Sequence, residues 1–73
     1  MEKQDLLLFE HKLVWLKQAN GFGLYLYVLR VGDETILARD WNLRNYVFAF
    51  SDIKTCRELN PKEKEKFSDG GDR

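Results

Sequence analysis

Hydrophobic residues between positions 13 and 50 fall into short runs that are separated by turn signals. Asn20-Gly21 favours a tight hairpin turn, because both residues tolerate a positive φ angle. Gly32-Asp33 marks a second reversal, and a looser turn runs from 40 to 45. The runs between these turns are rich in β-branched and aromatic residues, at 13–16, 23–31, 35–38 and 46–50. This pattern predicts an antiparallel meander of about four strands.

The run at 23–31 is apolar on both of its faces. Because side chains alternate along a strand, Leu24, Leu26 and Val28 share one face. The opposite face carries Tyr25, Tyr27, Leu29 and Val31. We therefore expect a central strand that is covered on both sides. The second cover comes from the N-terminal segment, from curvature of the sheet towards a barrel, or from a partner.

The hydrophobic period changes after Phe50. Ile53, Cys56 and Leu59 recur three residues apart, and Ser51 is a natural N-cap. These features predict a short helix at 52–59 that packs against the sheet. The helix is expected to end before Pro61, because the residue before a proline avoids the helical region. With this helix the expected core consists of Leu16, Leu24, Leu26, Val28, Ile36, Val47, Phe48, Ile53, Cys56 and Leu59.

The two ends of the chain differ in character. The N-terminal stretch "DLLLFEHKLVW" fits either a strand or a helix capped by Asp5, and we expect a short helix or an extended arm at 5–11. The C-terminal stretch "PKEKEKFSDGGDR" has one apolar residue, Phe67, and is expected to be a mobile tail. The chain is thus predicted to be a single small α+β domain at 1–60 with a disordered charged tail at 61–73.

Charge and length limit the classes of partner. The chain has 73 residues, and its 12 basic and 12 acidic residues cancel. Nucleic-acid binders usually carry a basic excess, so nucleic acid is not expected as the primary partner. No run reaches the length of a membrane span, and the N-terminus lacks the pattern of a signal peptide. A single cysteine fits a reducing compartment, and we expect a cytoplasmic protein that does not contact membranes.

The sequence does not bring together the residue types that a catalytic site requires. His11 has no serine or cysteine near it in sequence, and one histidine with one cysteine cannot form a structural zinc site. Gly21-Phe22-Gly23 resembles the start of a phosphate-binding fingerprint, but a strand follows it where that fingerprint needs a helix. We expect no enzymatic activity and no cofactor.

Two binding functions remain. A protein partner would contact the apolar N-terminal region, where the candidate residues are Leu7, Phe9, Lys12 and Trp15. A single-stranded nucleic acid would stack its bases on an aromatic sheet face, where the candidate residues are Tyr25, Tyr27, Arg30 and Arg39. The alternative to both is that the aromatic rings serve packing alone.

The whole chain resembles small phage-encoded regulators that bind and inhibit host RNA polymerase. The features that carry this resemblance are the bare 73-residue domain, the apolar arm "LLLFEHKLVW" and the charged segment "PKEKEKF". The resemblance implies a non-enzymatic protein that docks on host RNA polymerase and inhibits transcription. It assigns no individual residue a role.

Overall fold

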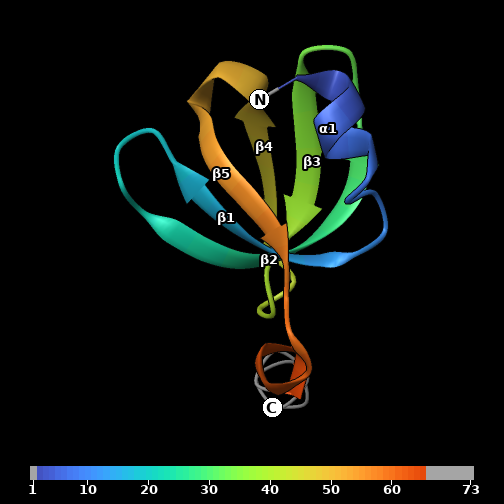
Figure 1. Cartoon of the computed structure of the whole chain (residues 1–73), viewed down its shortest axis with the longest axis vertical. Coiled ribbons are helices and arrows are strands. Elements are labelled where there is room, and N and C mark those ends of the chain that lie inside the picture. The colour runs from blue at the N-terminus through green and yellow to red at the C-terminus, as the bar shows by residue number, and fades with distance from the viewer. Residues whose placement is uncertain (1, 66–73) are drawn as a thin grey trace.

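A computed structural model describes residues 2–65, which form a curved antiparallel sheet with short helical segments at its ends (Figure 1). The helical segments are α1 (Lys3–Leu7), the 3-10 turn η1 (Phe50–Asp52) and a helical turn at 61–65. The strands are β1 (Leu13–Gln18), β2 (Gly23–Val31), β3 (Thr35–Arg39), β4 (Asn45–Ala49) and β5 (Ile53–Glu58). The α+β class and the antiparallel sheet predicted from the sequence are therefore present, with a fifth strand added.

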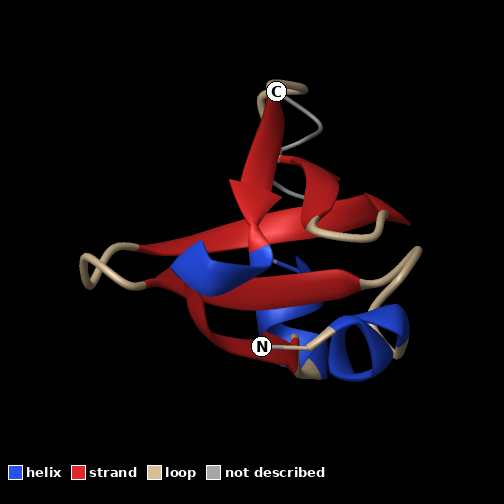
Figure 2. Ribbon diagram, turned by 90° about the horizontal axis from the view of Figure 1, so that it is seen from above, coloured by secondary structure: helices blue, strands red, loops and turns tan. Residues whose placement is uncertain are grey.

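The five strands lie in the order β4-β3-β2-β1-β5, and every pair of neighbours is antiparallel. The sheet curls strongly, as Figures 1 and 2 show, but β4 and β5 are not hydrogen-bonded to each other. β4 and β5 are consequently the two edge strands. In Figure 1, α1 and the helical turn at 61–65 lie at opposite ends of the long axis.

The core occupies the inner face of the curl, and every strand contributes to it. Its buried members are Leu6, Val14, Leu16, Leu26, Val28, Val31, Ile36, Ala38, Phe48, Ile53 and Cys56. Leu6 reaches the core from α1, which is also tied to the β2–β3 turn by an ion pair between Lys3 and Asp33. We call the opposite side of the sheet the outer face.

The predicted helix at 52–59 is wrong, because Ile53–Glu58 is the fifth strand. Lys17 pairs with Thr55 and Gln18 pairs with Ile53, so Lys54 is an extra residue in a β-bulge. The bulge lets Ile53 and Cys56 both face the core although they are three residues apart. The bulge in this strand therefore accounts for the spacing of three residues, which is otherwise typical of a helix.

A second bulge changes the faces of β2. Val28 pairs with Ala38 and Arg30 pairs with Leu37, which leaves Leu29 unpaired. Val31 is consequently turned to the inner face and is buried, rather than lying beside the tyrosines as predicted.

One residue of the predicted core, Val47, is not part of it. Val47 is 67% exposed, because it lies on the outer face of the edge strand β4, between the inward-facing Tyr46 and Phe48. Leu24 is half-buried and packs against the core cluster.

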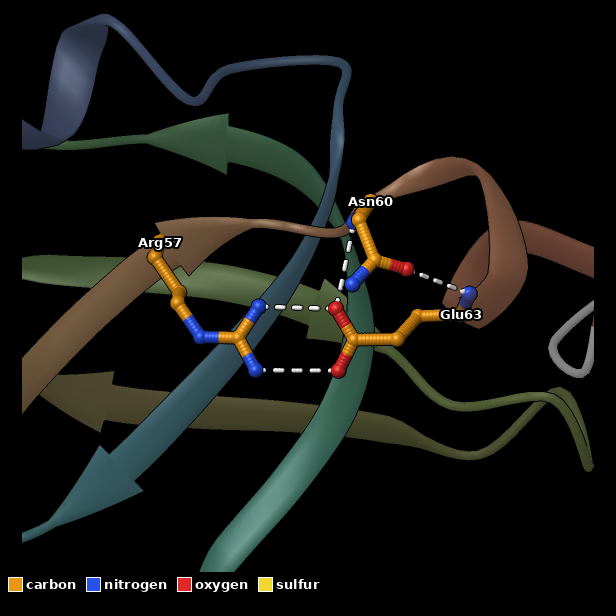
Figure 3. Close-up of polar contacts among 3 residues, drawn as sticks. All are labelled: Arg57, Asn60 and Glu63. Atoms are coloured by element: carbon orange, nitrogen blue, oxygen red, sulfur yellow. Dashed lines mark hydrogen bonds and ion pairs between the residues drawn. The ribbon is translucent and has the colours of Figure 1, made fainter.

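The helical turn at 61–65 begins with a capping box (Figure 3). The Asn60 side chain accepts a hydrogen bond from the N–H of Glu63 at 2.9 Å, and the Glu63 carboxylate accepts one from the N–H of Asn60 at 3.1 Å. Pro61 occupies the first helical position, where its missing N–H costs nothing. The mobile tail was expected to start at this proline. Its remaining part, 66–73, lies outside the described residues.

Candidate functional site

The turn between β3 and β4 is built around the carboxylate of Asp40. Its Oδ1 atom accepts hydrogen bonds from the N–H groups of Asn42 and Arg44, both at 2.9 Å, and its Oδ2 atom accepts one from the Tyr46 hydroxyl at 3.0 Å. The backbone closes the turn, since the N–H of Leu43 donates to the Asp40 carbonyl at 3.0 Å. The turn therefore has a defined shape.

The hydrogen bonds keep Asp40 ionised. Burial by itself would raise the pKa of this carboxyl, but the donors from Arg44, Tyr46 and Asn42 outweigh it and lower the pKa. The same contact raises the pKa of Tyr46, because the neutral phenol donates to the carboxylate. Asp40 thus stabilises the turn in its charged form.

This turn exposes two large apolar side chains. Leu43 is 74% exposed and Trp41 is 43% exposed. We call these two residues the apolar turn. In Figure 1 the turn projects from the end of the sheet that lies away from α1.

Leu43 also has an unusual backbone conformation. Its φ angle is 65°, in the left-handed region where glycine or asparagine is normally found. A non-glycine residue held there costs on the order of 1–3 kcal/mol, and such residues cluster at functional sites. Leucine at this position gains little burial in return, since most of its surface contacts solvent. The strain and the exposure together make the apolar turn the candidate binding site.

The four residues predicted to bind a protein partner do not form one surface. Leu7 is 45% exposed at the end of α1, but Phe9 is half-buried against the core. Lys12 is exposed and pairs with Glu58 at 3.6 Å. Trp15 alternates with the buried Val14 and Leu16, so it lies on the outer face, opposite to the core.

Trp15 is occupied by contacts within the chain. The guanidinium of Arg57 lies 5.2 Å from the centre of its ring, a cation–π contact. The indole also lies against Gly23, where an added Cβ would come within 2.7 Å of the Trp15 Nε1 atom. Arg57 itself is held by Glu63 through two hydrogen bonds of 2.7 and 2.9 Å (Figure 3). These contacts give Trp15 and Gly23 a structural role.

The four residues of the nucleic-acid alternative do share a face. Trp15 pairs with Tyr25, Tyr27 pairs with Arg39, and Arg30 pairs with Leu37. Each of these pairs lies on the outer face. Within the described strands this face carries Lys17, Arg30, Arg39 and Arg57 and no acidic residue.

Glu63 provides a test of the contact with Arg57. The two hydrogen bonds from Arg57, followed by that from the Asn60 N–H, lower the pKa of Glu63 from 4.5 to about 2. A lowered pKa means that the stabilisation is present above pH 4.5 and is lost as the pH falls through about 2. Carboxyl-carbon NMR is expected to give a titration midpoint for Glu63 near the lower value. In Arg57→Met the midpoint should move back towards 4.5, and an unchanged midpoint would contradict the ion pair.

Cys56 is predicted to be unreactive in the folded protein. Its side chain is buried, and burial raises the pKa of the thiol from 9.0 to about 11. The fraction of reactive thiolate should therefore be about a hundredfold lower than in an unfolded chain. A disulfide reagent such as DTNB is expected to label the native protein slowly and the urea-unfolded protein rapidly. Fast labelling of the native chain would place Cys56 outside the core.

The chain matches no protein-family model, and no curated protein or solved structure shows significant similarity to it. Within residues 2–65 there is no group of three or more histidine, cysteine or acidic side chains that could hold a metal ion. No helix in the part of the chain that the structure describes is long and apolar enough to cross a membrane.

The contact residues predicted from the sequence do not include Trp41, Leu43 and Val47, which are exposed in the structure. A signal was present for the first two, because they are large apolar residues inside a predicted turn, where side chains are exposed by default. Val47 carried no such signal. Its exposure depends on β4 being an edge strand, which is a property of the strand order.

Proposed function

We propose that this protein is a non-enzymatic regulator that binds another protein through the apolar turn. The observation that carries the proposal is Leu43, which is 74% exposed at a φ angle of 65°. A turn selected for stability alone would have glycine or asparagine there. A leucine and a neighbouring tryptophan, presented on a turn of defined shape, are the kind of anchors that dominate protein interfaces.

The resemblance to phage-encoded regulators suggests the partner. On this proposal the apolar turn docks on host RNA polymerase in the cytoplasm and inhibits transcription. The apolar turn lies at the opposite end of the molecule from the N-terminal arm (Figure 1). Trp15 and Phe9 then act as packing residues.

Leu43→Gly separates binding from folding. Glycine relieves the strain at positive φ, at the cost of its greater freedom in the unfolded chain, so stability should be unchanged or should rise by up to about 1 kcal/mol. Partner binding should be lost, because a hot-spot anchor contributes about 2 kcal/mol or more. Thermal unfolding and binding are measured side by side. A marked loss of stability in Leu43→Gly would show that Leu43 has a structural role.

The functional experiment is transcription in vitro with purified bacterial RNA polymerase. Wild-type protein is expected to inhibit, and Leu43→Gly is expected to lose inhibition while staying folded. Leu8→Ala is the matched control, because Leu8 is 69% exposed but lies next to α1 at the other end. Equal inhibition by wild type and Leu43→Gly would exclude the apolar turn. Absence of inhibition and of co-purification by the wild type would exclude RNA polymerase as the partner.

The outer face favours a second candidate function, the binding of single-stranded nucleic acid. The chain is neutral as a whole, but the outer face of the strands is basic and carries Tyr25 and Tyr27. Phosphates would pair with Arg30 and Arg39, and bases would stack on the tyrosine rings.

Titration of a labelled oligonucleotide at several salt concentrations tests this candidate. Binding through the outer face should weaken steeply as the salt concentration rises. In Arg30→Gln the slope of log K against log salt concentration should be smaller in magnitude by about one. Lys54→Gln, in the bulge of β5, is the control and should leave the slope unchanged. Salt-independent or undetectable binding would rule the candidate out.

A further inference from the structure

The free edge of β4 is unprotected against strand pairing. Within Asn45–Ala49 no residue is charged or a proline, and the pairing with β3 runs without a register shift. Natural sheet edges are usually protected by charges, prolines or bulges, because an open edge is a template for another strand.

The other edge of the same sheet has these protections. β5 contains the bulge at Lys54 and the charged residues Arg57 and Glu58. Glu58 forms ion pairs with Lys12 and Lys64, at 3.6 and 2.9 Å. The contrast between the two edges indicates that β4, and not β5, is available for pairing.

The hydrogen-bond pattern shows which groups of β4 are available. The Phe50 N–H donates to the Glu34 carbonyl, and the Asp40 N–H donates to the Arg44 carbonyl. Antiparallel pairs alternate, so Arg44, Tyr46, Phe48 and Phe50 direct their backbone groups towards β3. The N–H and C=O groups of Asn45, Val47 and Ala49 therefore point away from the sheet.

We propose that β4 pairs with β4 of a second copy of this chain, antiparallel and with Val47 at the two-fold axis. In this register Val47 faces its own counterpart and Asn45 faces Ala49, and each pair exchanges its backbone hydrogen bonds. No charged residue of either strand meets a like charge. The contact buries Val47, which is otherwise 67% exposed.

Charge favours a second copy as the occupant of this edge. The strand Asn45–Ala49 has no charged side chain, so two copies can meet about a two-fold axis without placing like charges together. The chain also has a formal net charge of zero, so long-range repulsion between copies is minimal. The dimer leaves an apolar turn at each end of the joint strand pair, and it would present two copies of the proposed docking site. The dimer does not depend on that proposed function.

Sedimentation equilibrium of the full chain over a wide concentration range tests the proposal. The expected result is a reversible equilibrium between the 8.7 kDa monomer and a species of twice that mass. Val47→Lys places like charges opposite each other and should raise the dissociation constant at least about tenfold. Thr55→Lys, on the other edge strand, is the matched control and should leave the equilibrium unchanged. Circular dichroism confirms that both variants stay folded.

A second variant tests the backbone contact directly. Val47→Pro keeps an apolar residue but removes the outward N–H, a change that an edge strand tolerates. This variant should be monomeric, and the amide protons of Asn45 and Ala49 should exchange faster than in the wild-type dimer. A wild type that stays monomeric at every concentration would overturn the proposal. So would a dimer that survives Val47→Lys and Val47→Pro, or an assembly larger than two, which would require a head-to-tail contact.

Discussion

Leu6→Ala is expected to lower the free energy of unfolding by about 2–5 kcal/mol, which is the usual cost of removing a large core side chain. Leu6 is 1% exposed and is the residue by which α1 joins the core. A helix as short as Lys3–Leu7 has no stability of its own, so its attachment depends on this contact. A domain of this size has only about 3–5 kcal/mol to lose, so the substitution should remove a large part of its stability.

Urea denaturation followed by tryptophan fluorescence measures the effect of Leu6→Ala. Leu8→Ala is the control, because Leu8 is 69% exposed and follows the same helix. Its change in stability should stay within about 0.5 kcal/mol. Equal stability of the two variants would show that α1 is not part of the folded core.

Phe48→Ala is expected to cost about 3–5 kcal/mol, the range for truncating a buried phenylalanine. Phe48 lies on the inner face of β4, is 8% exposed, and stacks on Tyr46 with ring centres 5.9 Å apart. Its neighbour Val47 provides the control, since it points to the outer face of the same strand. Val47→Ala should cost less than about 1 kcal/mol at dilute protein concentration, mostly through lost β-propensity.

Thermal unfolding of both β4 variants at low concentration separates the two faces of the strand. A large loss for Phe48→Ala with a small loss for Val47→Ala would confirm the alternation of the edge strand. The reverse order would mean that the register of β4 is shifted by one residue, because a single-residue shift exchanges the two faces.

Local signals in the sequence predicted the first half of the sheet well. Asn20-Gly21 marks the hairpin between β1 and β2, although only Gly21 has the positive φ angle that was predicted for both residues. The alternation around Tyr25 and Tyr27 gives their face correctly. These features depend on residues close together in the chain, where turn chemistry and the period of two are sufficient.

The features that sequence reasoning missed depend on contacts between distant residues. The period of three at Ile53 and Cys56 reflects a bulge at Lys54, which forms only because β5 pairs with β1. Val47 is a β-branched apolar residue of the kind that usually lies in a core, and it is exposed only because β4 lies at an edge. The strain at Leu43 arises from the Asp40 turn, and no propensity scale for leucine would indicate it.

The strand order has a consequence for how the chain folds. β1, β2, β3 and β4 are joined in sequence as hairpins, so their pairing requires only short loops to close. β5 pairs instead with β1, and the whole of β2, β3 and β4 lies between them in the chain. Closing that long loop costs more conformational entropy than closing any of the hairpins. The burial of Ile53 and Cys56 offsets this cost. The topology therefore favours a route in which the hairpins form early and β5 docks last, completing the core in the final step of folding.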